Sequence, residues 1–140
     1  MAGTLRAEVL VSLPAQLRGA QKLFESTGGL HAAGLFSPDG DRMAVREDVG
    51  RHNALDELIG WALMEDRLPL SGRVVLVSGR PSFELVQKSL ATGAAALCSV
   101  SAPSSLAIDL AGEFDLTLVG FLHDGRFKLY SGAERVRLRS

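Results

Sequence analysis

The chain has 140 residues, of which 46% are hydrophobic and 22% charged, with a formal net charge of −1. This is the size and composition of one soluble domain. A charge near zero gives no general attraction for nucleic acid or for an anionic membrane, and no apolar run approaches the roughly 20 residues of a membrane-spanning helix. We therefore predict a single domain over residues 1–140 with no nucleic-acid or membrane partner, in which any anion site is local.

One cysteine, Cys98, excludes an intramolecular disulfide and a cysteine-based metal site. A lone thiol fits a reducing compartment. The N-terminus lacks the basic and then apolar segments of a signal peptide, so we predict a cytoplasmic protein. Cys98 lies in an apolar stretch, where a buried thiol is inert, and a packing role is favoured over a reactive one.

Strand and helix patterns alternate along the chain. Residues 1–11 predict a loose lead-in or a short strand, and Pro14 suits the first turn of a helix that ends at Gly28-Gly29. The predicted elements are, in order, a helix over 14–26, a hairpin with strands 30–36 and 42–47, a helix beginning near 48–53, a buried strand over 73–78, a helix over 82–91, a strand over 96–100, a helix over 104–111 and a hairpin with strands 116–122 and 127–130. The tail over 134–140 is predicted to fray. Alternating strands and helices imply a largely parallel sheet covered on both faces, so the predicted fold is a three-layer α/β/α domain with a mixed sheet.

Three polar clusters each lie where a predicted strand ends and a helix begins. They are Glu47 to Asn53, Ser78 to Ser82 and Ser101 to Ser105. In open α/β sheets, ligands bind beyond the carboxyl ends of parallel strands, and helix N-termini there suit phosphate groups. We therefore expect an anionic ligand at this edge of the sheet.

The first cluster has the strongest case for binding. Asp48 is a helix-capping residue type, Gly50 lets the backbone approach a ligand closely, and Arg51 offers a planar fork to phosphate. His52 and Asn53 add directional donors and acceptors. A plain capped helix would explain one polar residue but not this run, so the binding interpretation is favoured.

The other polar residues leave alternatives open. Arg80, in the first turn of a predicted helix, opposes the helix dipole, and a bound anion would compensate. An exposed arginine without a ligand is an equally good interpretation. Ser101 and Ser104 are favoured as helix caps. His31, within an apolar strand, is favoured as a core residue with satisfied hydrogen bonds.

Five segments, in order along the chain, carry a family resemblance. They are Thr27 to Ala33, Arg46 to Ala54, Ser78 to Arg80 with Glu84 and Lys88, Ser101 to Pro103, and Gly120-Phe121. Together they resemble the formate dehydrogenase accessory sulfurtransferase family, FdhD, over nearly the whole chain.

The resemblance implies a cytidine deaminase-like fold and a cytoplasmic protein, with a homodimer as the typical assembly. It implies that sulfur passes as a persulfide from a cysteine desulfurase to a molybdenum bis(molybdopterin guanine dinucleotide) cofactor, before that cofactor enters formate dehydrogenase. Family members bind this cofactor, or a GDP-like nucleotide, with a stretch that matches Phe121 to Arg126. The cofactor-binding residues that we predict are Gly28, Gly29, His31, Asp48, Gly50, Arg51, His52, Asn53, Ser78, Gly79, Arg80, Ser101, Phe121, Leu122, His123, Asp124, Gly125 and Arg126.

The chain also departs from the family pattern. The family's sulfur-carrying cysteines lie in a CxxC-type loop N-terminal to the part matched here, so the chain resembles the C-terminal portion of a longer protein. Cys98 does not match that motif, and we predict no catalytic residue and no metal site. His123 stands where family members often have arginine. Three functions stay open: a sulfurtransferase of which this chain supplies the cofactor-binding part, a non-catalytic cofactor-binding chaperone, and a guanine-nucleotide-binding module with another role.

Overall fold

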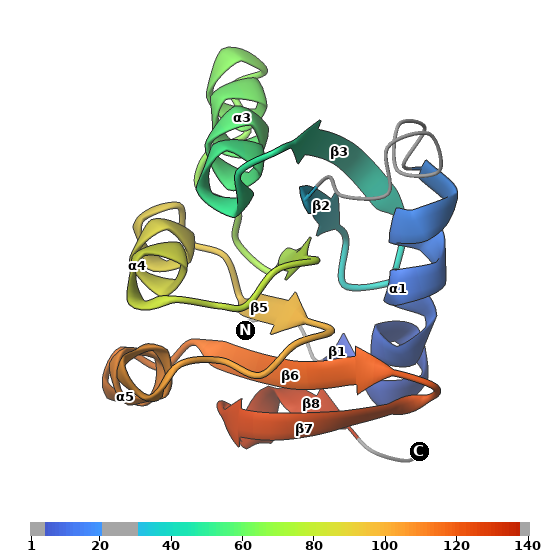
Figure 1. Ribbon diagram of the computed structural model, residues 1–140, viewed down its shortest axis with the longest axis vertical. Helices are drawn as coiled ribbons and strands as arrows, with labels where there is room; N and C mark the ends of the chain where they lie inside the picture. Colours follow the sequence, from blue (N-terminus) through green and yellow to red (C-terminus); the bar gives the residue numbers. More distant parts are fainter. Residues whose placement is uncertain (1–4, 21–30, 138–140) are drawn as a thin grey trace.

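The computed structural model describes residues 5–20 and 31–137, the side chain of Arg51 excepted. Its central feature is a six-stranded sheet in the order β3-β2-β4-β5-β6-β7 (Figure 1). A second, two-stranded sheet pairs β1 with β8. The strands are β1 (Leu5–Arg6), β2 (His31–Phe36), β3 (Arg42–Asp48), β4 (Val74–Val77), β5 (Ala96–Ser99), β6 (Thr117–His123), β7 (Arg126–Ser131) and β8 (Val136–Arg137).

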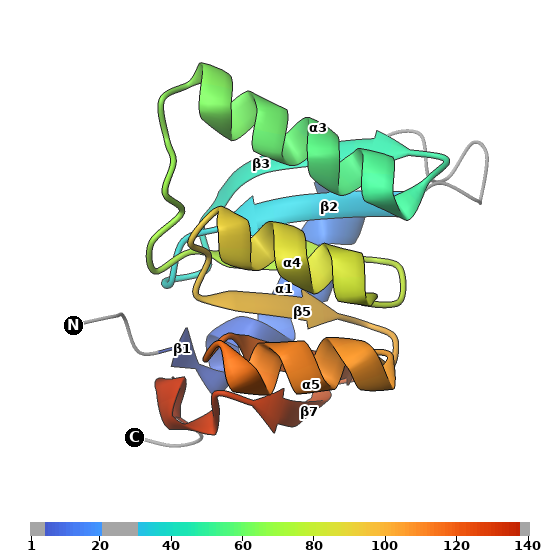
Figure 2. The same cartoon turned by 90° about the vertical axis from the view of Figure 1, so that its left-hand side faces the viewer.

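Helices cover both faces of the six-stranded sheet. Three of them lie side by side on one face and α1 lies on the other (Figure 1, Figure 2). One buried apolar cluster, with Leu58 and Leu97, joins the sheet to α3, α4 and α5, and a second, with Leu13 and Leu76, joins it to α1. The predicted three-layer α/β/α fold with a mixed sheet is therefore confirmed. The helices are α1 (Ala7–Ala20), α3 (Arg51–Met64), α4 (Phe83–Ala91), α5 (Ser105–Glu113) and the 3-10 helix η1 (Ala133–Arg135).

The strand directions correct one expectation. β4–β5 and β5–β6 are parallel pairs, whereas β2–β3, β2–β4 and β6–β7 are antiparallel. The prediction of a largely parallel sheet is therefore wrong. The physical reason is that a hairpin at each side of the sheet adds antiparallel hydrogen bonding to the parallel centre.

The N-terminal helix lies earlier than its sequence pattern predicted. α1 begins at Ala7, so Pro14 lies inside it and the predicted helix start at Pro14 is wrong. Of the two alternatives for residues 1–11, the short strand is borne out by β1 (Leu5–Arg6), whereas the loose lead-in is wrong for the described residues, because α1 follows directly from Ala7. Apolar packing of the helix against the sheet offsets the N–H group that proline lacks. The predicted helix end at Gly28-Gly29 lies outside the described residues. The buried face of α1 consists of Val9, Leu10, Leu13 and Leu17.

The C-terminal segment is held in place up to residue 137. β8 pairs in parallel with β1. Just before β8, the Arg135 guanidinium forms an ion pair of 2.7 Å with Asp115 and donates a hydrogen bond of 3.1 Å to the Thr117 hydroxyl. The prediction that the chain frays from residue 134 is therefore wrong for 134–137, because strand pairing and these contacts order the segment.

Four strands end at the same edge of the sheet. β3, β4, β5 and β6 run in one direction, because β2 is antiparallel to both β3 and β4. The helices α3, α4 and α5 begin at this edge (Figure 2), and β2 begins there because His31 pairs with Asp48. We call this region, which consists of His31 and residues 48–53, 78–82, 100–104 and 121–126, the carboxyl edge.

Candidate functional site

The carboxyl edge brings together the polar clusters that the sequence placed at strand ends. Residues 48–53 follow β3, residues 78–82 follow β4, residues 100–104 follow β5, and residues 121–126 begin in β6 and continue through the turn into β7. The predicted site residues that the structure describes thus lie on one side of the molecule. Gly28 and Gly29 lie outside the described residues.

A buried serine that the sequence interpretation missed connects two of these loops. The Ser99 hydroxyl donates a hydrogen bond of 2.7 Å to the Gly79 carbonyl and accepts one of 2.9 Å from the Ser101 N–H. The Ser101 carbonyl in turn accepts from the Phe121 N–H at 3.2 Å. The loops after β4 and β5 and the end of β6 are therefore held in one fixed arrangement. In the sequence, the feature that could have indicated this role is a serine at the end of an otherwise apolar strand.

Serines at this edge have separate roles. Ser82 caps α4 and Ser104 caps α5, with their hydroxyls accepting from Leu85 and Ala107 N–H groups, so the capping prediction for Ser104 is confirmed. Ser101 is not a cap, and that expectation is wrong, because the chain needs three more residues before α5 begins. The Ser78 hydroxyl accepts from the Ala32 N–H at 2.9 Å and extends the pairing of β2 with β4.

The N-terminus of α3 is not capped by the residue that the sequence predicted. Gly50 is the N-cap residue and makes no side-chain capping bond, so Asp48 is not the cap. Asp48 lies two residues earlier, where its carboxylate accepts from the Gly50 N–H at 3.1 Å and from the Asn53 side-chain amide at 3.3 Å. A hydrogen bond from Glu57, followed by that from Gly50, lowers the pKa of Asp48, and the same shared hydrogen bond raises the pKa of Glu57. Asp48 therefore acts as an anion that orders the loop.

Three arginines at or beside the carboxyl edge have exposed side chains without a partner among the described residues. The side chains of Arg18, Arg80 and Arg126 are exposed, and within the described ranges they have no hydrogen-bond or ion-pair partner. Unpaired guanidinium groups offer planar forks to phosphate. In the loop after β3, His52 is half-buried and Asn53 is exposed. This group of positive charges suits an anionic ligand although the whole chain is close to neutral.

The turn from β6 to β7 has an unusual backbone. Phe121 and Asp124 are non-glycine residues with φ of 52° and 54°, and Gly125 follows with φ of 73°. The register of β6 against β7 shifts between Gly120 and His123. Phe121 lies within this irregular stretch, and 43% of its surface is exposed. Leu122 is buried, so the side chain of this predicted site residue packs in the core rather than facing a ligand. An exposed aromatic ring in a left-handed backbone is a platform on which a base can stack.

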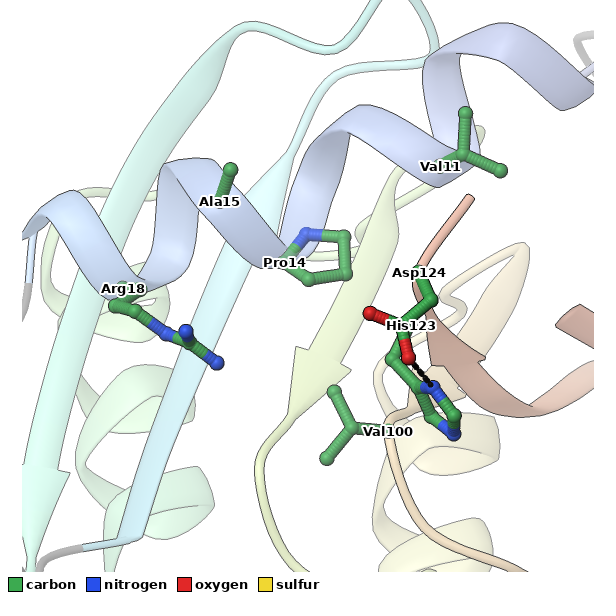
Figure 3. Close-up of a pocket in the computed structure, with 7 residues that line it drawn as sticks. All are labelled: Val11, Pro14, Ala15, Arg18, Val100, His123 and Asp124. Carbon is green, nitrogen blue, oxygen red and sulfur yellow. Dashed lines mark hydrogen bonds and ion pairs between the residues drawn. The ribbon is translucent and has the colours of Figure 1, made fainter. Parts of the chain in front are cut away.

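A pocket of about 450 Å³ opens between α1 and this turn. Figure 3 shows Arg18 at one end, and His123 with Asp124 at the other, where the His123 Nδ1 lies 3.1 Å from the Asp124 carboxylate. The sequence interpretation found the residues of the turn but missed those of α1, because that stretch carries no motif. The lining residues are Val11, Pro14, Ala15, Arg18, Val100, His123 and Asp124.

The single thiol is not part of this site. Cys98 is fully buried in β5, and burial raises its pKa to about 12. We expect the native protein to react with a soluble thiol reagent at least about a hundredfold more slowly than the protein in denaturant, because labelling needs local opening. Labelling at similar rates in the two states would contradict the buried placement.

The fold and its carboxyl edge define an α/β domain whose polar side chains gather where such domains hold ligands. The chain belongs to the FdhD/NarQ family, whose model matches residues 2–137. It is 61% identical to the sulfur carrier protein FdhD of Nocardia farcinica over 96% of this chain and 48% of that protein. It is 45% identical to the protein of the same name in Saccharolobus solfataricus, over 94% of this chain and 51% of that protein.

A solved structure shows the same fold. A crystal structure of a candidate formate dehydrogenase accessory protein from Desulfotalea psychrophila superposes with a TM-score of 0.88 at 29% identity, and covers 96% of this chain and 60% of that one. The chain thus spans about half the length of the curated relatives it matches. Within the described residues, no helix has both the length and the apolar character needed to cross a bilayer.

Proposed function

We propose that this chain supplies the cargo-binding surface of a sulfur carrier protein that serves formate dehydrogenase. The cargo would be a molybdenum bis(molybdopterin guanine dinucleotide) cofactor, with a guanine nucleotide part held at the carboxyl edge. A cysteine desulfurase would supply the sulfur, formate dehydrogenase would receive the sulfurated cofactor, and the working assembly would be a cytoplasmic homodimer. Membership of the FdhD/NarQ family and the names of the relatives support this proposal.

The proposal rests mainly on one observation: Arg18, Arg80 and Arg126 are exposed and have no partner among the described residues, and the Phe121 ring of the carboxyl edge is exposed as well. Each charge-assisted hydrogen bond to phosphate contributes about 1.5–3 kcal/mol, and stacking of a base on an aromatic ring contributes about 1–3 kcal/mol. Together these residues offer contacts for both ends of a nucleotide. The pocket beside Arg18 and His123 adds a partly apolar wall for the ligand.

The buried Cys98 bears on how the chain could act. A thiol with a pKa near 12 and no exposed surface is a poor carrier of persulfide sulfur. This favours non-covalent cofactor binding as the role of this chain, whether the whole protein is a sulfurtransferase or a non-catalytic chaperone. Replacing the CxxC cysteines of a full-length family member by alanine separates these two: formate dehydrogenase would stay inactive in the first case and mature in the second.

Calorimetric titration with GDP tests the site. We expect binding to the wild type, and about tenfold weaker binding after Arg80→Ala or Arg126→Ala, because each change removes one charge-assisted contact. Arg42→Ala is the matched control, because Arg42 is also exposed but lies at the start of β3, at the opposite edge of the sheet. Absence of GDP binding, or equal affinities for all three variants, would refute the assignment.

A further inference from the structure

The outer face of α5 carries an apolar stripe that the proposed cofactor site does not use. Leu106, Leu110 and Phe114 follow one another at intervals of four residues, which places them along one side of the helix. Leu106 is 64% exposed and Phe114 is 58% exposed. Large apolar side chains clustered on a surface indicate an interaction site more often than scattered ones do.

Two residues of this stripe, Leu110 and Phe114, form one wall of a groove between two helices. α4 and α5 lie side by side and run in the same direction (Figure 2). Gln87, Leu90 and Ala91 of α4 face Leu110 and Phe114 of α5 across a volume of about 620 Å³. We call these five residues the α4–α5 groove. It lies toward the C-terminal ends of both helices and so at the far end of the molecule from the carboxyl edge.

The charge at the border of the groove is negative. Asp109 and Glu113 lie on α5 next to the apolar stripe, both are exposed, and neither has an ion-pair partner within the part of the chain that the structure describes. α5 contains no basic residue. The nearby cation of α4, Lys88, forms an ion pair of 2.8 Å with Asp56 of α3 and is thereby neutralised. An occupant that complements the groove therefore brings apolar and basic side chains.

We propose that the α4–α5 groove docks a basic amphipathic helix of a partner protein. Its apolar side chains would fill the space between Leu90 and Phe114, and its Lys or Arg side chains would face Asp109 and Glu113. A helix is the fitting element, because an amphipathic helix can lay its apolar face, with anchor side chains three or four residues apart, into a hydrophobic groove. This proposal is independent of the cofactor site and would place a protein partner away from the bound cargo.

Two synthetic helical peptides with the same apolar stripe test the charge complementarity. One peptide has lysines beside the stripe and the other has glutamates at the same positions, and both are labelled for fluorescence anisotropy. We expect the lysine peptide to bind saturably and more weakly as ionic strength rises, and the glutamate peptide to bind at least about tenfold more weakly. Equal binding of the two peptides, or no binding of the lysine peptide, would overturn the proposal.

Substitutions of two exposed apolar residues locate the binding surface. Phe114→Ser removes a side chain of the groove that is 58% exposed, and it is expected to weaken binding of the lysine peptide about tenfold. Leu63→Ser removes a leucine that is 66% exposed on α3, outside the groove, and is expected to leave peptide binding unchanged. GDP binding should be the same in both variants, so a failure here is distinct from a failure of the cofactor site. Equal effects of the two substitutions on peptide affinity would contradict docking in the groove.

Discussion

Replacing Gly120 by alanine is expected to lower the free energy of unfolding by about 3 kcal/mol and to weaken GDP binding. Gly120 is buried in β6, and a Cβ atom there would lie 2.8 Å from the Pro103 ring, 2.8 Å from the Tyr130 ring and 3.1 Å from the Ser101 carbonyl oxygen. The Ser101 carbonyl accepts the Phe121 N–H, so relief of the overlap would displace both residues of the carboxyl edge.

Gly112 offers the matched control for this substitution. It lies within α5, and a Cβ added there meets nothing within 4 Å. Gly112→Ala should therefore raise stability by about 0.5–1 kcal/mol, because alanine restricts the unfolded chain and favours helix. Urea unfolding of both variants measures the difference. If Gly120→Ala were as stable as the wild type, the close packing of β6 against the loop after β5 would be wrong.

Removing the Ser99 hydroxyl is expected to cost about 2–3 kcal/mol of stability. Ser99→Ala leaves the Gly79 carbonyl and the Ser101 N–H without their partner, and a buried polar group without a hydrogen bond costs about 1–3 kcal/mol. Because Ser99 connects the loops after β4 and β5, the same change should also reduce GDP affinity. Urea unfolding and calorimetry give the two values.

Ser89 is the control for the Ser99 variant, because it is also a buried serine. Its hydroxyl donates to the Leu85 carbonyl, which already accepts a backbone hydrogen bond of α4. Ser89→Ala therefore leaves no backbone group unpaired and should cost less than about 1 kcal/mol. Similar losses for the two variants would show that Ser99 contributes by packing alone.

The central part of the fold follows from short-range patterns in the sequence. The continuous apolar run Val74–Val77 indicated a strand buried on both faces, and all four residues are buried in β4. The stripe that includes Leu55 and Leu58 indicated α3, and both leucines lie in the core. These predictions were confirmed because each depends on a short stretch of sequence. The spacing of apolar residues indicates whether the stretch is a helix or a strand, and the order of helices and strands then indicates which strand ends lie at the same edge of the sheet.

The features that the sequence did not predict depend on contacts between distant segments. Pro14 suggested a helix start, yet packing of α1 on the sheet carries the helix through it. The pocket beside Arg18 exists because α1 crosses near the turn at His123, and no local pattern encodes that approach. The hydrogen bonds of Ser99 likewise join loops about 20 residues apart in sequence.

Backbone NMR of the labelled chain during titration with GDP shows directly whether a nucleotide binds at the carboxyl edge. We expect saturable shift changes concentrated at this edge, in the loops after β4 and β5 and around Phe121 and Arg126, with the resonances of the α4–α5 groove unmoved. Shift changes centred on the α4–α5 groove, or no changes up to millimolar GDP, would contradict the placement of a nucleotide site at the carboxyl edge.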